Sequence, residues 1–168
     1  ALNPANNELE GNLLYDTGLD FKYGLSSETI VDVTINPDFS QVEADPDQID
    51  VNRRYELYFP EKRSFFLESS EKFKTPIEAF YSRRIKDPLF GTKITGKVGQ
   101  YNFGYLSTLD EGLEGNPDAM YNVFRLQKDL ANQSSVGFIF TDKEYQGRNG
   151  HLGNRLFGVD TRQRFMDH

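Results

Sequence analysis

A period of two in the hydrophobicity pattern is the feature that most constrains how this chain can fold. From residue 18 onward, apolar residues alternate with small or charged ones in two neighbouring runs, first at Leu19, Phe21, Tyr23 and Leu25, then at Thr29, Val31, Val33 and Ile35. Successive side chains of a β-strand point to opposite faces, so this period predicts strands rather than helices. Pairing the runs as a hairpin places Tyr23 opposite Val31, which makes one face apolar and the other mostly polar.

The same alternation recurs in the rest of the chain. A turn at Gly99-Gln100 pairs Val98 with Tyr101, so this hairpin also has one apolar and one polar face. A third hairpin spans residues 122–142, where Ile139 is the exception on an otherwise polar face, and a last alternating run covers residues 154–165. We therefore predict seven strands in an all-β fold, arranged as an antiparallel up-and-down meander.

The connections between these runs fall into two classes that alternate along the chain. Short turns at residues 26–28, 99–100 and 130–133 are separated by long polar connections at residues 36–91, 110–119 and 143–154. Residues 77–90 also alternate, but as a crossing strand they would put the Gly99-Gln100 turn on the side of the long loops. We therefore assign them to one long structured loop, residues 36–91, within a partial β-barrel of residues 18–168 that follows an N-terminal linker of residues 1–17.

Short turns on one side and long loops on the other are typical of transmembrane β-barrels, in which apolar residues face lipid and polar residues face the lumen. The predicted lumen-facing residues are charged: Lys93, Lys97, Arg125, Asp160 and Arg162. A soluble antiparallel sheet would alternate in the same way, so the pattern leaves both alternatives open. Because bacterial single-chain barrels have even strand numbers, seven strands are interpreted as part of a barrel, closed by further strands or by another element.

Composition excludes several functional classes. The chain has no cysteine, hence neither disulfides nor thiolate chemistry, and its net charge of −7 argues against nucleic acid as a partner. It also has no apolar run long enough for a transmembrane helix. The start, ALNPANNELEGN, has no signal-peptide pattern, so we expect any export signal to have been removed or to lie outside this sequence.

A long motif, NPDFSQVEADPDQIDVNRRYELYFPEKRSFFLE at residues 36–68, is followed by FYSRRI, GTKITGKVGQYNFGYLS and FGVD. Over residues 18–165 the chain resembles the start of the barrel portion in a family of Gram-negative outer-membrane proteins. That family also carries an N-terminal domain similar to a family 9 carbohydrate-binding module. Two departures are Ser64, where the family often has Pro, and ESSEKF in place of a Gly-containing stretch. The resemblance implies the cell outer membrane as location, roles in transport or carbohydrate binding, and outer-membrane lipid, glycans and other outer-membrane or cell-surface proteins as partners.

The charges of the long loop are the candidate ligand or plug contacts: Arg53, Arg54, Glu61, Lys62, Arg63, Glu68, Arg83 and Arg84. Aromatic neighbours of this motif would anchor the loop while its charges pair with those of the lumen. We favour a structural plug in which the ions satisfy one another. Paired arginines could instead clamp an anionic ligand, or pair with the acidic run at Glu43, Asp45, Asp47 and Asp50.

No constellation in the sequence predicts catalytic residues, a metal site or a cofactor. An EF-hand frame starting at Asp45 fails because Asp50 occupies the required Gly position. His151 and His168 have no partner at catalytic spacing. We therefore predict a non-enzymatic barrel segment whose loop 36–91 acts as plug, gate or docking surface. Two alternatives stay open: a soluble or peripheral glycan-binding sheet that uses Tyr81, Tyr101 and Tyr105, and a membrane-associated glycoside hydrolase that uses Glu61 and Glu68.

Overall fold

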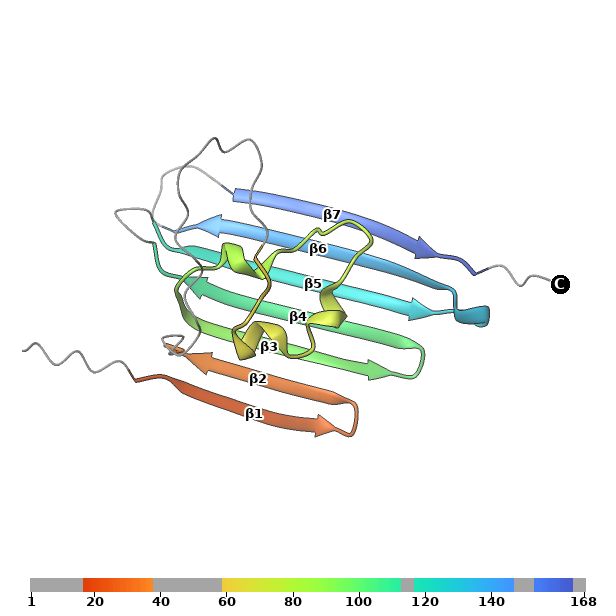
Figure 1. Cartoon of the computed structure of the whole chain (residues 1–168), viewed down its shortest axis with the longest axis horizontal. Coiled ribbons are helices and arrows are strands. Elements are labelled where there is room, and N and C mark those ends of the chain that lie inside the picture. Colours follow the sequence, from red (N-terminus) through yellow and green to blue (C-terminus); the bar gives the residue numbers. More distant parts are fainter. Residues whose placement is uncertain (1–16, 38–58, 113–116, 147–152, 165–168) are drawn as a thin grey trace, which may run out of the picture.

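The main element of the protein is one antiparallel sheet of seven strands (Figure 1). The structure is a computed structural model that describes residues 17–37, 59–112, 117–146 and 153–164. The strands are β1 (Leu19–Ser26), β2 (Thr29–Ile35), β3 (Pro88–Val98), β4 (Tyr101–Asp110), β5 (Ala119–Asp129), β6 (Ser135–Tyr145) and β7 (Gly153–Arg162). Each strand pairs with its neighbours in sequence, which confirms the predicted up-and-down meander. Within the described residues, β1 and β7 form opposite edges, so the sheet is not closed into a barrel.

Strand register agrees with the pairing expected from hydrophobic alternation. Tyr23 pairs with Val31, and Val98 pairs with Tyr101. The first turn is shorter than expected, because β1 continues through an irregularity to Ser26 and only two residues link it to Thr29. The third strand also begins earlier than the boundary at Gly91, since Pro88 already pairs with β4. Proline is compatible with this place because the first residue of a strand need not donate to the ladder.

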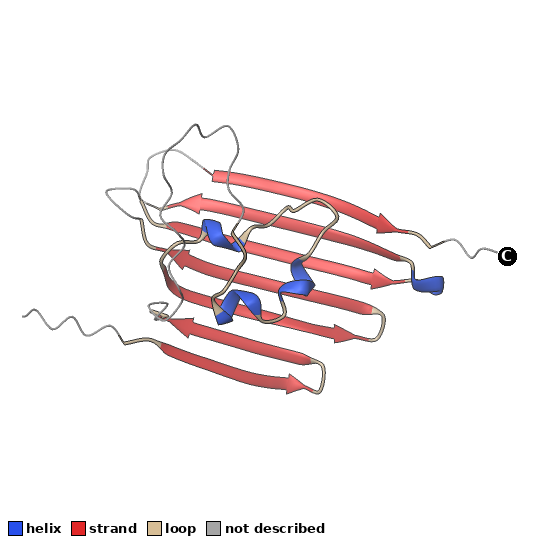
Figure 2. Ribbon diagram, viewed as in Figure 1, coloured by secondary structure: helices blue, strands red, loops and turns tan. Residues whose placement is uncertain are grey.

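The excursion, residues 36–87, joins β2 to β3, and its described part lies over one face of the sheet (Figure 2). It contains one turn of α-helix, α1 (Ser64–Leu67), and two 3-10 turns, η1 (Ser70–Phe73) and η2 (Ser82–Arg84). A further 3-10 turn, η4 (Ala131–Gln133), connects β5 to β6. These single turns were not predicted, because they are too short to show a helical period. No helix of the described residues is long and apolar enough to cross a membrane.

Two phenylalanine rings of the excursion sit on glycines of the sheet. A Cβ atom at Gly91 would lie 2.8 Å from Cζ of Phe65, and one at Gly104 would lie 2.9 Å from Cε1 of Phe73. Glycine is therefore needed at both places for the rings to approach the backbone. They belong to a buried cluster that unites the excursion with β4, β5 and β6: Phe65, Phe66, Phe73, Ile85, Leu106, Ala119, Tyr121, Val123 and Ile139. We call this side of the sheet the covered face.

The other side of the sheet, the uncovered face, exposes apolar side chains that nothing in the described structure packs against. The most exposed lie on the edge strands, where Phe21 is 61%, Phe157 70% and Val159 78% exposed. Rings of neighbouring strands meet on this face, as Phe140 and Phe157 do at a centroid distance of 4.8 Å. The sheet thus carries its core on the covered face and leaves a large apolar surface on the other, an arrangement that in a monomeric soluble protein is unusual.

Replacing Gly104 by Ala should loosen the excursion from the sheet, because the new methyl group would overlap the ring of Phe73. We expect the free energy of unfolding to fall by about 1–3 kcal/mol, as for overpacked cores. Chemical denaturation followed by circular dichroism measures the change. The control is Gly24→Ala in β1, where the nearest atom to the added Cβ is 3.8 Å away. Equal effects of both substitutions would contradict the packing role of Gly104.

Candidate functional site

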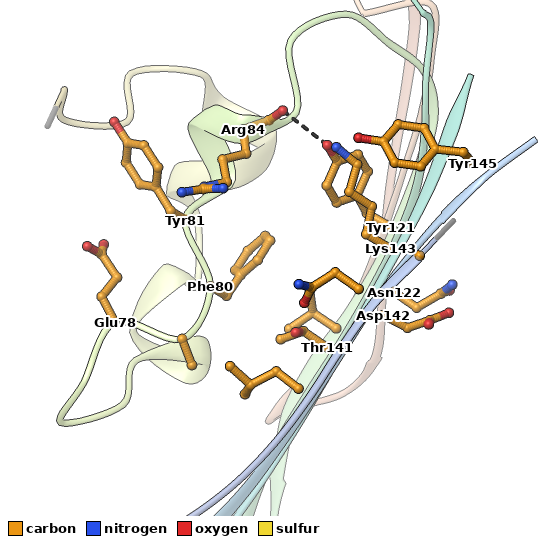
Figure 3. Close-up of a pocket in the computed structure, with 15 residues that line it drawn as sticks. Glu78, Phe80, Tyr81, Arg84, Tyr121, Asn122, Thr141, Asp142, Lys143 and Tyr145 are labelled. Carbon is orange, nitrogen blue, oxygen red and sulfur yellow. Dashed lines mark hydrogen bonds between the residues drawn. The ribbon is translucent and has the colours of Figure 1, made fainter. Parts of the chain in front are cut away.

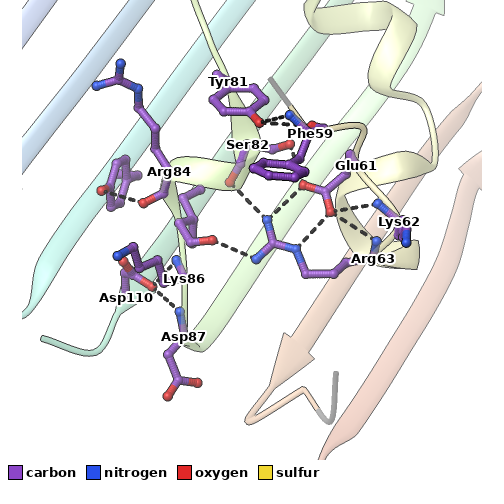
Figure 4. Close-up of polar contacts among 12 residues, drawn as sticks. Phe59, Glu61, Lys62, Arg63, Tyr81, Ser82, Arg84, Lys86, Asp87 and Asp110 are labelled. Carbon is purple, nitrogen blue, oxygen red and sulfur yellow. Dashed lines mark hydrogen bonds and ion pairs between the residues drawn. The ribbon is translucent and has the colours of Figure 1, made fainter. Parts of the chain in front are cut away.

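A bidentate ion pair between Glu61 and Arg63 forms the centre of the FPEKRSFF motif (Figure 4). Nε of Arg63 donates to Oε1 of Glu61 at 2.8 Å, and a terminal nitrogen donates to Oε2 at 2.8 Å. The backbone amides of Lys62 and Arg63 donate to the same carboxylate. The guanidinium also lies 4.3 Å from the ring centroid of Phe66. Both charged groups are almost fully enclosed, with side-chain exposures of 6% and 11%.

The same pair ties the two halves of the excursion together. Arg63 donates to the carbonyl of Ile85 at 2.7 Å and to that of Ser82 at 3.0 Å, while the hydroxyl of Ser82 donates to Glu61 at 2.6 Å. The hydroxyl of Tyr81 similarly bonds the amide and carbonyl of Phe59. Charge-assisted bonds of this kind are stronger than neutral ones. Glu61 and Arg63 therefore fix the shape of the excursion through contacts with each other and with its backbone.

The environment of Glu61 has opposing effects on its ionisation. Burial would raise the pKa of Glu61, but hydrogen bonds from Arg63 and Ser82 outweigh it and hold the pKa below its ordinary value. The carboxylate is therefore charged at neutral pH and favours the folded excursion. A group with a depressed folded pKa stabilises the protein above its unfolded pKa and loses that contribution as the pH falls through the folded value.

Lys93 of β3, on the covered face, anchors the excursion to the sheet. Its side chain is 1% exposed, and Nζ donates to the carbonyls of Phe65 at 2.5 Å and Glu68 at 2.8 Å, at the end of α1. Asp32 of β2 balances its charge at 3.3 Å. At the other end of the excursion, Asp110 of β4 accepts hydrogen bonds from the amides of Lys86 and Asp87 (Figure 4). The covered face thus supplies both a donor and an acceptor for the excursion's backbone.

The other predicted lumen-facing residues also lie on the covered side. Arg125 of β5, 2% exposed, reaches across Gly137 to a bidentate contact with Asp160 of β7. Lys97 pairs with Asp129 at 2.9 Å near the turn end of the sheet. Arg162 is exposed on β7, at the position paired with Ser135. The Lys97–Asp129 pair joins β3 to β5, and the Arg125–Asp160 pair joins β5 to β7. Each pair therefore spans one intervening strand and braces the sheet laterally.

The remaining predicted contacts that the structure describes lie in different parts of the excursion. Glu68 forms an ion pair with Lys22 of β1. Arg83 and Arg84 lie in η2, and the carbonyl of Arg84 accepts a hydrogen bond from the hydroxyl of Tyr121 at 3.2 Å. Lys62 is exposed. The pair at positions 53 and 54, Arg53 and Arg54, lies outside the described residues, as does the acidic run that begins at Glu43.

A cavity of about 640 Å³ separates the excursion from β5, β6 and β7 (Figure 3). The excursion contributes Phe80, Tyr81 and Arg84 to one wall. The sheet contributes Tyr121, Thr141, Lys143 and Tyr145 to the opposite wall, and Asn154 and Leu156 extend it along β7. Nζ of Lys143 lies 4.7 Å from the ring centroid of Tyr121 and 4.6 Å from that of Tyr145.

Sequence reasoning missed the part of the sheet wall formed by Lys143 and Tyr145. Residues 143–154 were expected to form a loop, whereas β6 continues to Tyr145 and β7 begins at Gly153. The signal was available, because Thr141, Lys143 and Tyr145 continue the alternation that starts at Ser135. The described residues contain no group of three or more acidic or histidine side chains suited to a metal ion.

Replacing Glu61 by Gln should destabilise the protein at neutral pH by about 1–3 kcal/mol, because Arg63 loses its charged acceptor inside the excursion. The difference between the two proteins should shrink as the pH falls from 4.5 through the lower folded pKa of Glu61, where the carboxylate becomes protonated. Denaturation curves between pH 7 and pH 3 measure it. A difference that stays constant over this range would contradict the assigned role of the carboxylate.

Asp160→Asn should cost about 3–5 kcal/mol of stability, because it leaves the buried guanidinium of Arg125 without a counter-charge. The matched control is Asp142→Asn, which removes the partner of Arg155, a side chain that is 62% exposed. Exposed pairs contribute little, so the control should lose much less. Denaturant midpoints of the two variants provide the comparison. Equal losses would show that burial of Arg125 does not set the cost.

Comparison with known proteins gives a family but no function. Among curated proteins and among solved structures, nothing matches this chain. A family model described as "Domain of unknown function (DUF5916)" matches residues 2–99, more than half of the chain. The matched range includes β1, β2, β3 and the whole excursion with its Glu61–Arg63 pair. The chain therefore belongs to the DUF5916 family.

Proposed function

We propose that this chain forms part of the wall of an outer-membrane β-barrel, with its uncovered face toward lipid. One observation carries the proposal: a row of apolar residues crosses the whole uncovered face, one per strand and each paired with the next. From β1 to β7 the row consists of Tyr23, Val31, Ile94, Tyr105, Phe124, Phe140 and Phe157. A lipid-facing band of apolar and aromatic residues is typical of such barrels.

The apolar band also runs obliquely to the strands. In the next row toward the long loops, the edge strands β1 and β2 still present Phe21 and Val33, whereas β5, β6 and β7 present Asn122, Asp142 and Arg155. At the end of the sheet with the short turns, β2 begins at Thr29, which pairs with Gly96 of β3. The hairpin of β3 and β4 continues for two more residue pairs, to Val98 and Tyr101. Barrel strands are tilted by roughly 35–45° to the membrane normal, so a membrane boundary should cross them at such a slant.

The covered face supports a lumen position for the excursion. Barrel interiors are polar, and the charges of this face are compensated: Lys93 by Asp32, Lys97 by Asp129, and Arg125 by Asp160. The excursion packs on this face through Phe65, Phe73 and its backbone rather than extending from the sheet. We infer that it acts as a plug or gate that narrows the passage through the barrel.

The resemblance of residues 36–68 to outer-membrane proteins with a carbohydrate-binding domain supports location in the cell outer membrane. It also supports passage or binding of glycans, with outer-membrane lipid and other cell-surface proteins as partners. In this function the chain has no catalytic residue, and Glu61 and Glu68 serve as ion-pair partners of Arg63 and Lys22. The excursion and the lumen wall would together select what passes.

A second candidate is a soluble or peripheral glycan-binding sheet. The observation in its favour is the exposure of two tyrosines on the uncovered face, Tyr101 at 45% and Tyr105 at 36%. Such rings could stack on sugars in water. The two candidates differ in what touches the uncovered face, and this difference can be tested by a single charge placed there.

Phe157→Arg should impair membrane assembly, because a charge at the bilayer midplane costs a transmembrane barrel about 2–4 kcal/mol. Assembly is measured by outer-membrane fractionation and by heat-modifiable mobility in gels. The control is Thr161→Arg. Thr161 lies on the same strand and face as Phe157 but near the short turns, and the row of paired residues that contains it already includes a charged residue, Lys128. In a soluble sheet Phe157 is already 70% exposed to water, so both variants would fold equally well and the barrel proposal would fail.

A further inference from the structure

We propose that the cavity between the excursion and strands β5 to β7 binds a sugar acid, a saccharide unit that carries a carboxylate. The inference rests on the proposed function, in which glycans reach the cavity through the barrel. It adds the class of ligand that binds next to the excursion. The cavity volume of about 640 Å³ lies within the range of small-molecule sites, roughly 300–1,000 Å³. Its two walls belong to different parts of the chain, as Figure 3 shows.

The cavity differs from the rest of the covered face in how its basic side chain is paired. Lys93, Lys97 and Arg125 each have a carboxylate partner within 3.3 Å. Among the described residues, Lys143 has no carboxylate at ion-pair distance, and its charged group lies between the rings of Tyr121 and Tyr145. A cation held in this way keeps an electrostatic preference for an anion.

The carboxylates near Lys143 do not replace such an anion. Asp110 acts on Lys143 only through longer-range electrostatics, and its oxygen Oδ1 accepts the amides of Lys86 and Asp87. Glu78 is exposed and lies on the excursion, across the cavity (Figure 3). Arg84 adds a second cationic side chain to the excursion wall. Asp142 also lines the cavity, but it is paired with Arg155 at 2.8 Å. Lys143 is therefore the positive group of the sheet wall that has no carboxylate at ion-pair distance within the described residues.

The other lining groups suit a hydroxylated ring rather than a bare anion. Phe80 on the excursion wall points toward Tyr121 and Tyr145 on the sheet wall, so flat apolar surfaces lie on both sides of the space (Figure 3). Aromatic rings bind the apolar faces of ligands, and tyrosine hydroxyls add polar contacts. Thr141 and the amide of Asn154 supply neutral hydrogen-bonding groups. Aromatic rings on both walls, neutral hydrogen-bonding groups and the cations Lys143 and Arg84 together match a pyranose ring with a carboxylate.

The experiment compares binding of D-galacturonate and D-galactose, which differ at C6 by the carboxylate, to the protein in detergent. Isothermal titration calorimetry measures the affinity, and saturation-transfer NMR detects contact between sugar protons and aromatic rings. We expect galacturonate to bind and galactose to bind at least about tenfold more weakly, the loss of one charge-assisted contact. Lys143→Gln should reduce galacturonate affinity to the level of galactose, whereas Lys143→Arg should retain it.

The matched control is Lys128→Gln, which removes a lysine 5.4 Å from the ring centroid of Tyr101 on the uncovered face. Its affinity for galacturonate should be that of the unchanged protein. Equal binding of the two sugars, no binding of galacturonate, or an equal loss in the Lys128 variant would overturn the proposal. Heat-modifiable mobility of each variant reports assembly separately, so failure of the cavity site and failure of the barrel proposal are distinguishable.

Discussion

Docking of the excursion onto the covered face is the interaction on which the rest of the structure depends. The rings of Phe65 and Phe73 approach the strands at Gly91 and Gly104, where no side chain stands in their way. This contact gives a single curved layer of strands a core, since a sheet must bury one face against another element. It also places the Glu61–Arg63 pair and the aromatic wall of the cavity over the sheet.

Charge distribution follows from the same docking. Burying an ion is costly unless a partner compensates it, and losing one member of a buried pair costs more than the pair contributes. Lys93 and Arg125, nearly inaccessible beneath or beside the excursion, accordingly have carboxylate partners on other strands of the sheet. Lys143 borders open space and is flanked by tyrosine rings instead. The covered face therefore divides into a compensated region that holds the excursion and a cationic region that faces the cavity.

Much of the fold was predictable because hydrophobic alternation is a local property that each strand carries by itself. It gave the strand number, the meander and the pairing of Tyr23 with Val31 and of Val98 with Tyr101. Ile139, an apolar exception on a polar face, is 1% exposed within the buried cluster. Its place in the pattern marked a member of the buried core, which the alternation alone could not identify. Strand ends were predicted less well, since Pro88 and Lys143 resemble loop residues in composition.

The sequence by itself determined the sheet, its two chemically different faces and the residues that carry charge into the covered one. Only the tertiary structure decided which charges meet. Glu61 and Arg63 are close in sequence, but Arg125 finds Asp160 and Lys93 finds Asp32 through strand pairing. The tertiary structure also brought Phe80 opposite Tyr121 and Lys143. The physical reason is that periodicity fixes the direction of a side chain, whereas its partners depend on where a long, irregular segment folds back in space.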